Sequence, residues 1–439
     1  MNLRHLAALL LACAALAATS CFAPPLRSSS ASFVENSELA GFEDVRARDG
    51  FLSKPFQTSF TQHLGQRKTL WQVRNGLGPM PYRMLVLSSG GPNGVFGAGV
   101  LEGWSEAGTR PEFDTVLGTS VGALLAPFAF LGSEYDPVLR EIFAELEGGD
   151  LHEPRSKFAI LTADSTMSSE PLAELINRRF DMQLLEEIAQ AHELGRRLFV
   201  GTTNLDSGMF MIWDIGSIAE RRTEEARQLA CRVLRASAAI PMLYQPVTFD
   251  AVEVGTGRPV EELHVDGAVV RPMFLPDQVF NSAIAAAEAG VRWSECDVDL
   301  YVISNGPLIR RGELVAARAL DIAQSAVATM VFSMMQDDLL HLYIMSRAWG
   351  ADFHYVSIPE GLDIEDPIDF ESPDSAELYQ IGRDLGLAQA WRSSPPRWIA
   401  GDDIQSLQSV LESRETEALA EIERAKLLGV PTPELLKVP

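Results

Sequence analysis

A serine between two glycines is the first feature of this 439-residue chain that could do chemistry. Residues 118–122 read GTSVG and follow the apolar run Phe113–Leu117. A serine in this pattern sits on a sharp turn from strand to helix, where Gly118 and Gly122 remove the clashes of a Cβ. Its hydroxyl is exposed at the carboxyl end of the sheet, near the N–H groups that open the next helix. We interpret Ser120 as a nucleophile rather than as part of an ordinary turn.

A glycine-rich loop follows an earlier apolar run. Met84–Leu87 is a predicted strand, and residues 89–94 directly after it read SGGPNG. Such a loop exposes backbone N–H groups that can bind an oxyanion. Its spacing is also that of a degenerate dinucleotide-binding loop, which needs an acidic residue at the end of the second strand. That strand instead ends at Gly118, and no P-loop lysine follows the glycines, so an oxyanion hole is favoured.

An aspartate is the third chemical group. Asp266 opens the sequence DGA and follows the alternating run Leu263–Val265. This places it at a strand end, near the ends of other strands. Taken alone, an ordinary turn aspartate before glycine explains it equally well.

The order of these three motifs resembles the patatin-like phospholipase family. A glycine loop, then GxSxG, then Asp-Gly-Ala or Asp-Gly-Gly is typical of that family. Residues 97–101 (GAGVL) and 235–241 (RASAAIP) agree with it as well. The resemblance covers roughly residues 83–308. It implies a Ser–Asp dyad, with Ser120 as nucleophile and Asp266 as the base that activates it.

The resemblance also implies that the glycine loop binds the oxyanion. The expected donors are the backbone N–H groups of Gly90, Gly91, Asn93 and Gly94. Pro92 has no N–H and cannot donate. The loop departs from the family twice, because Ser89 replaces the first glycine of the usual triple and Asn93 replaces the usual Arg or Lys. The missing cation weakens the expectation of a phospholipid substrate more than that of hydrolysis.

Histidines offer a competing mechanism, since a conventional triad places a histidine after the serine and the aspartate. His341 falls within a predicted helix and His354 within a predicted strand, neither in a strand-end loop. His264 faces the same way as Asp266 on one strand, which makes it worth testing. A dyad is therefore the favoured interpretation.

Apolar strands alternate with helical patterns along the body, which predicts a three-layer α/β/α fold with a mostly parallel sheet. There is no internal repeat. The helix Val121–Leu131 is apolar all round and is expected to be buried on every side. A long helical stretch, Glu313–Trp349, carries Met330, Met334, Met335 and Met345, which suit either plain core or an adaptable wall for an acyl chain. The predicted strands outside the motifs are 198–203 paired with 209–214, 300–304 and 353–356.

Composition excludes several classes of protein. The chain has 36 Lys and Arg against 60 Asp and Glu, a net charge of −24, which argues against a nucleic-acid partner. Four cysteines without a CxxC pair argue against a disulfide scaffold and a zinc site. Cys231 and Cys296 either pair or remain free thiols. The acidic residues of 363–371 are interpreted as a solvated loop, so no metal or cofactor is expected.

The N-terminus has the features of an export signal. Residues 1–21 combine a basic start, a short apolar run and small residues before Cys21, similar to the lipobox of bacterial lipoproteins, although Ala18 replaces the favoured leucine. We expect Cys21 to carry a lipid anchor in the cell envelope; plain secretion and a retained anchor are the alternatives. The predicted parts are a tether over 22–55, the hydrolase domain over 56–400, and an acidic helix and tail over 401–439.

Together these features predict an exported lipid acyl hydrolase of the phospholipase A or lysophospholipase type. Its expected partners are a lipid or ester substrate and a membrane surface. A small-ester carboxylesterase or an acyltransferase is the alternative among enzymes, and a non-catalytic lipid-binding protein the alternative from another class. The oligomeric state stays open.

Overall fold

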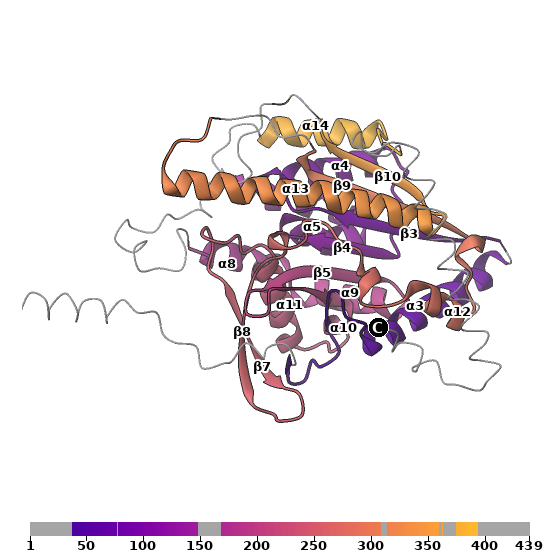
Figure 1. Ribbon diagram of the computed structural model, residues 1–439. Helices are drawn as coiled ribbons and strands as arrows, with labels where there is room; N and C mark the ends of the chain where they lie inside the picture. Colours follow the sequence, from indigo (N-terminus) through magenta and orange to yellow (C-terminus); the bar gives the residue numbers. More distant parts are fainter. Residues whose placement is uncertain are drawn as a thin grey trace, which may run out of the picture.

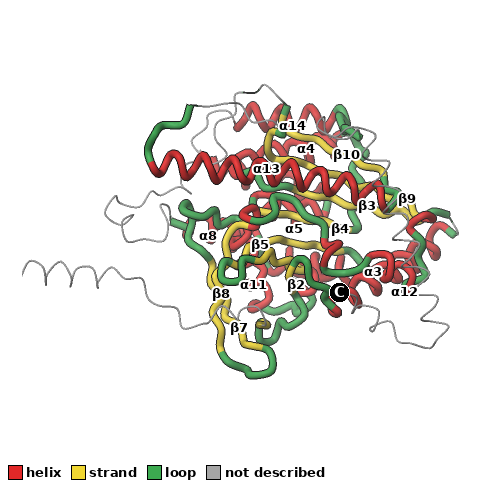
Figure 2. Tube along the Cα trace, in the orientation of Figure 1, coloured by secondary structure: helices red, strands yellow, loops and turns green. Residues whose placement is uncertain are grey.

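One ten-stranded sheet forms the centre of the computed structural model, which describes residues 37–76, 78–147, 168–308, 314–359, 362 and 375–393. Helices lie on both sides of the sheet (Figure 1), as the secondary-structure colouring also shows (Figure 2). The strands are β1 (Ser37–Glu38), β2 (Arg46–Arg48), β3 (Met80–Leu87), β4 (Thr115–Thr119), β5 (Arg197–Asn204), β6 (Met209–Asp214), β7 (Val247–Glu253), β8 (Pro259–Asp266), β9 (Cys296–Pro307) and β10 (Asp352–Ile358).

The helices of the described residues include one of 30 residues, α13. The α-helices are α3 (Lys54–Asn75), α4 (Gly94–Glu106), α5 (Val121–Leu131), α6 (Asp136–Glu147), α8 (Glu170–Arg179), α9 (Met182–Glu193), α10 (Ile215–Ala219), α11 (Glu224–Ser237), α12 (Ser282–Glu288), α13 (Ala319–Ala348) and α14 (Ser375–Leu387). Short 3₁₀ helices are η1 (Gly91–Asn93), η2 (Ser133–Tyr135), η3 (Gly267–Val269), η4 (Pro276–Gln278) and η5 (Trp293–Glu295).

The strand order confirms the predicted α/β fold with a mostly parallel sheet. The order is β1-β7-β8-β5-β4-β3-β9-β10, and β6 joins β5 to β2. Strands β5, β4, β3, β9 and β10 run parallel to their neighbours in this series. Strands β8, β7, β1, β6 and β2 add antiparallel pairs around β5. The carboxyl ends of the parallel strands therefore share one edge.

Alternating side chains of each central strand enter two hydrophobic cores. On β3, Leu85 and Leu87 pack with the helices of one face, including α4 and α5, while Met84 and Val86 pack on the other face, with α3 and α13. This period of two is the geometry of an extended strand. Helix α5 has the predicted bounds, Val121–Leu131, and most of its side chains are buried. Both faces of the sheet are thus covered, as expected for a parallel sheet.

One edge of β5 changes partner part-way along the strand. Gly201 pairs with Thr119, the last residue of β4, whereas Thr202 pairs with Asp266, the last residue of β8. Strand β6 occupies the opposite edge of β5 over the same residues. Strands β4 and β8 therefore meet end to end along β5. The residue after Thr119 is Ser120, so this junction sets two of the predicted functional residues beside each other.

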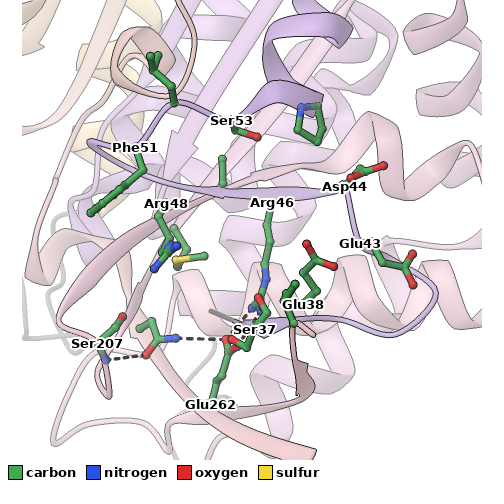
Figure 3. A pocket seen from close by; sticks show the side chains of 16 residues that line it. Ser37, Glu38, Glu43, Asp44, Arg46, Arg48, Phe51, Ser53, Ser207 and Glu262 are labelled. Atoms are coloured by element: carbon green, nitrogen blue, oxygen red, sulfur yellow. Dashed lines mark hydrogen bonds and ion pairs between the residues drawn. The ribbon is translucent and has the colours of Figure 1, made fainter. Parts of the chain in front are cut away.

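The residues just before α3 differ from the predicted tether. Within 37–53, β1 pairs with β7 and β2 with β6, so this segment extends the sheet. The guanidinium of Arg46 forms two hydrogen bonds with the carboxylate of Glu262 on β8, at 2.6 and 2.7 Å (Figure 3). Buried Val45 and Ala47 flank it. Strand β2 was not predicted from the sequence because its apolar part is very short.

Several predicted features lie outside the described residues. They are the signal with Cys21, the tether up to residue 36, the acidic loop 363–371, and the helix and tail 401–439. Cys231, which is buried, and Cys296, which is partly exposed, are free thiols. Within the described ranges, every helix is too short or too polar to cross a membrane.

Candidate active site

Ser120 sits at a strained turn between β4 and α5. Its backbone has φ 58° and ψ −127°, a conformation that residues with a side chain rarely adopt. The backbone around this turn is packed so closely that only glycine fits at positions 118 and 122. A Cβ on Gly118 would lie 2.4 Å from the carbonyl oxygen of Gly122, and one on Gly122 would lie 2.2 Å from the carbonyl oxygen of Leu87. This is the geometry expected of a GxSxG turn.

The side chains of Ser120 and Asp266 form a hydrogen bond. The hydroxyl Oγ of Ser120 donates to Oδ2 of Asp266 at 2.6 Å, and Oδ1 of Asp266 accepts the N–H of Ala268 at 2.8 Å. Only 3% of Ser120 and 2% of Asp266 is exposed to solvent. Burial raises the pKa of Asp266 to about 7, although both hydrogen bonds oppose the shift. A carboxylate of that basicity can accept a proton from a hydroxyl near neutral pH.

The end of α11 holds both residues of this pair in place. The hydroxyl of Ser237 accepts the N–H of Ser120 at 2.9 Å and donates to the carbonyl oxygen of Gly201 at 2.7 Å. Two residues further on, the carbonyl oxygen of Ala239 accepts the N–H of Asp266 at 3.0 Å. The segment 235–241 therefore connects the ends of β4 and β8 with the interior of β5. The sequence drew attention to this segment, but it gave no role to Ser237.

The glycine loop supplies fewer free N–H groups than expected. In η1 the N–H of Asn93 donates to the carbonyl oxygen of Gly90 at 3.1 Å, and that of Gly94 donates to carbonyl oxygens of the same turn. These two expected donors are therefore already engaged. Among the described residues, the N–H groups of Gly90 and Gly91 have no acceptor. They are the loop donors that can still bind an oxyanion.

Asn305, near the end of β9, forms hydrogen bonds with Ser88 and so holds the start of the glycine loop in place. Its backbone N–H donates to Oγ of Ser88 at 2.7 Å, and its side-chain Nδ2 donates to the carbonyl oxygen of Ser88 at 2.8 Å. A Cβ on Gly90 would lie 2.2 Å from the carbonyl oxygen of Asn305, and one on Gly97 would lie 2.3 Å from its side-chain oxygen. Both glycines are needed because Asn305 fills the space.

The two residues that depart from the family pattern are both buried. The N–H of Ser89 donates to the carbonyl oxygen of Pro272 at 2.9 Å, which joins the loop to the chain after Asp266. The hydroxyl of Ser89 and the side-chain nitrogen of Asn93 have no hydrogen-bond partner in the described part of the chain. Asn93 thus replaces a cation with a neutral, buried amide.

The three histidines considered for a triad lie away from Ser120. His264 contacts Oε2 of Glu262 at 3.0 Å and Oγ1 of Thr202 at 3.0 Å, in a buried network that continues to Arg46. Burial lowers the pKa of His264 and favours its neutral form. His341 lies 3.4 Å from Asp277, and His354 lies 2.8 Å from Asp299. Within the described ranges, no histidine forms a hydrogen bond with the Ser120–Asp266 pair.

A cavity of about 360 Å³ lies next to the loop that follows Asp266. Its lining includes Val270 and Arg271 from that loop, Phe210 from β6 and Met334 from α13. Arg271 bridges Asp49 at 2.7 Å and Asp338 at 3.2 Å. The described residues contain no group of three or more His, Cys, Asp or Glu side chains that could hold a metal ion.

Comparison with known proteins identifies the class of this site. Residues 85–277 match the family model for patatin-like phospholipases. This part of the chain is therefore similar to the patatin-like phospholipase family, which supports a lipid acyl hydrolase at the level of the family. The match spans the glycine loop, GTSVG and DGA, and it confirms the resemblance that the motifs indicated.

Two further comparisons add little. The chain is similar to the crystal structure of VipD from Legionella pneumophila, with 11% identity and a TM-score of 0.29 over 81% of this chain and 78% of VipD. A likeness at that TM-score carries no argument. A search of curated proteins found no significant match.

The clamp formed by Ser237 gives a first prediction. Ser237→Ala should lower kcat/KM for an ester about tenfold or more, because small displacements of reacting groups have large effects on rate. It should also destabilise the fold by about 1–3 kcal/mol, since two buried groups lose their partner. The matched control is Ser346→Ala, which removes another fully buried hydroxyl, one that donates to the carbonyl oxygen of Tyr343 at 2.7 Å. Equal losses of kcat/KM in the two variants would show that Ser237 has only a structural role.

Proposed function

We propose that this protein hydrolyses the acyl esters of lipids through a Ser120–Asp266 dyad, as a phospholipase A or lysophospholipase. The observation that carries the proposal is the 2.6 Å hydrogen bond between the two side chains at a strained strand-to-helix turn. The family to which residues 85–277 are similar supports a lipid ester as the substrate class. Among the described residues, no histidine forms a hydrogen bond with this pair, which favours a dyad over a triad.

The proposed reaction begins with proton transfer from Ser120 to Asp266. As the proton leaves, Oγ of Ser120 attacks the ester carbonyl carbon, and the carbonyl oxygen becomes an oxyanion. The free N–H groups of Gly90 and Gly91 stabilise this charge. Asp266 then protonates the leaving alcohol oxygen, and the acyl group stays on Ser120. In the second half, Asp266 takes a proton from water, and the resulting hydroxide attacks the carbonyl carbon of the acyl ester. The bond to Oγ of Ser120 then breaks, Asp266 returns the proton to Oγ, and the fatty acid leaves.

The proposed location is the bacterial cell envelope, with a lipid anchor on Cys21. The support comes from the sequence, in which small residues precede Cys21 after a short apolar run. The described body begins at residue 37 with a strand of the main sheet, so residues 22–36 remain to join it to the anchor. Holding an enzyme at a surface raises the effective concentration of a lipid substrate.

Loss of the nucleophile is the direct test of the dyad. A fluorophosphonate probe, which reacts with activated serines, should label the wild-type chain and fail to label Ser120→Ala. The same variant should lose at least about 10⁴-fold in kcat, and Asp266→Asn combined with it should cost little more, because members of such a unit are not additive. Thermal unfolding followed by circular dichroism checks that both variants fold. Near-wild-type turnover by Ser120→Ala would rule the dyad out.

The pH dependence follows from the burial of Asp266. The base must be ionised to accept the proton, and its pKa is raised to about 7. We therefore expect kcat/KM to fall about tenfold per pH unit well below 7 and to level off above it. The fall of kcat/KM below pH 7 should persist in His341→Gln and in His354→Gln. Its disappearance in either variant would mean that a histidine, and not Asp266, is the base.

The anchor can be tested by intact mass of the mature protein. Acylation predicts a mature chain that begins at Cys21 and carries added acyl mass, and that fractionates with membranes. Cys21→Ser should block processing or release the chain, whereas Cys296→Ser, which changes a partly exposed cysteine of the body, should leave location unchanged. A mature N-terminus beyond residue 21 without added mass would indicate ordinary secretion.

A further inference from the structure

The two halves of α13 have different surroundings. In its C-terminal half, Met335, Leu339, Leu342 and Tyr343 are buried in the core on the α3 side of the sheet. Toward its N-terminus the exposed fractions are 53% for Ile322, 39% for Val327 and 62% for Met330, and Leu314, just before the helix, is fully exposed. We call residues 322–336 the apolar arm. Figure 1 shows α13 crossing the front of the molecule, with its N-terminal end at the left.

The apolar arm lacks the charges found on the rest of the surface. Residues 322–336 contain no Asp, Glu, Lys or Arg in a chain of net charge −24. Helix α11 shows the contrast, since its first two residues are Glu224 and Glu225, and half-exposed Glu224 forms an ion pair with Arg227. Ile322, Ala326 and Met330 follow the spacing of four residues that puts side chains on one face of a helix. An exposed apolar face of this kind marks an interaction site.

The C-terminal end of the apolar arm lies beside the candidate active site. Met335 contacts Oγ of Ser304 through its sulfur at 3.4 Å, and Gln336 donates to the carbonyl oxygen of Leu308. These residues flank Asn305, which supports the glycine loop. Met334 lines the 360 Å³ cavity with Val270, four residues after Asp266. The middle of α13 is therefore fixed beside the site, and the exposed apolar side chains extend from there toward the N-terminus of the helix.

We propose that the apolar arm docks on a lipid surface of neutral or zwitterionic lipid, and that it places the active-site edge of the sheet against that surface. The proposal rests on the proposed function and names the form in which the substrate is met. A buried Ser120 cannot reach an ester in a lipid layer unless the lipid moves into the protein. Docking shortens that path, because the C-terminal end of the arm lies beside Ser304 and beside the loop after Asp266.

Charge favours a neutral lipid surface over the other occupants. A second copy of this chain carries the same net charge of −24, and anionic lipid is also negative, so both are repelled at long range. The acidic C-terminal segment 401–439 of the chain itself is another negatively charged occupant. Zwitterionic lipid has no net charge, and its acyl region accepts apolar side chains, as for helices that lie in a membrane interface.

The test uses vesicles of ether-linked phosphatidylcholine, which an esterase cannot cleave. The chain used begins at residue 22, so that it carries neither the apolar signal nor an acyl anchor, and it contains Ser120→Ala, so that binding is separated from hydrolysis. Ile322→Asp with Met330→Asp should lower the vesicle partition coefficient by about tenfold or more for each side chain removed from the lipid. The matched control is Val73→Asp on α3, which changes another apolar side chain, 81% exposed, and should leave the partition coefficient unchanged.

Kinetics with Ser120 intact give the second measurement. The arm variant should hydrolyse a soluble short-chain ester at the wild-type rate and vesicle lipid at least about tenfold more slowly. If no ester is cleaved at all, the proposed function fails, while the binding experiment still tests the apolar arm. Equal vesicle binding by the arm variant and the parent chain would overturn the proposal.

Two other results would also overturn it. If sedimentation shows a dimer that Ile322→Asp with Met330→Asp converts to a monomer, while vesicle binding is absent, the arm is an interface between copies. If the chain from residue 22 to 439 does not bind vesicles but one ending at residue 393 does, the C-terminal segment covers the arm. Val327→Asp provides a second single variant should the double variant unfold, as judged by circular dichroism.

Discussion

The geometry of the site depends on one change of partner along β5. Gly201 pairs with the end of β4 and Thr202 with the end of β8, so two strands of opposite direction meet on the same edge. Ser120 follows the last residue of β4, and Asp266 is the last residue of β8. The backbone hydrogen bonds of the sheet therefore set the distance between these two residues. The side-chain bond of 2.6 Å is a consequence of this register. A shift of one residue in either strand would turn its side chain to the other face of the sheet.

The strain at Ser120 is tolerated because its surroundings fix it from several sides. A non-glycine residue in this conformation costs on the order of 1–3 kcal/mol. The apolar helix α5 that follows is buried, the glycines at 118 and 122 allow close packing, and Ser237 binds the N–H of Ser120. These contacts offset the cost and leave the hydroxyl aimed at Asp266. The glycine loop is held in the same manner by Asn305, which belongs to a different strand.

Local patterns in the sequence predicted the parts of the fold that depend on neighbours in the chain. The strand before GTSVG, the strand before the glycine loop and the bounds of α5 all follow from runs of apolar residues. The strands β1 and β2 were placed in the tether, because two or three residues of an edge strand carry no period. The engaged N–H groups of Asn93 and Gly94 were also missed, since the carbonyls that accept them depend on the turn. Ser237 lies in the segment 235–241 that resembles the family, but its role depends on the end of β4 meeting the interior of β5, which is a long-range contact.

The burial of Asp266 connects the chemistry of the site with the way a substrate reaches it. In the proposed dyad, which uses no histidine, the carboxylate must be basic enough to activate a serine, and removal from water is what raises its pKa to about 7. The same removal from water encloses Ser120, so a soluble, open cleft would weaken the base. A substrate that displaces water as it enters suits this requirement better than a hydrated one. If the arm docks as proposed, an acyl chain that enters from the lipid surface would keep the site dry, whereas entry through open solvent would not.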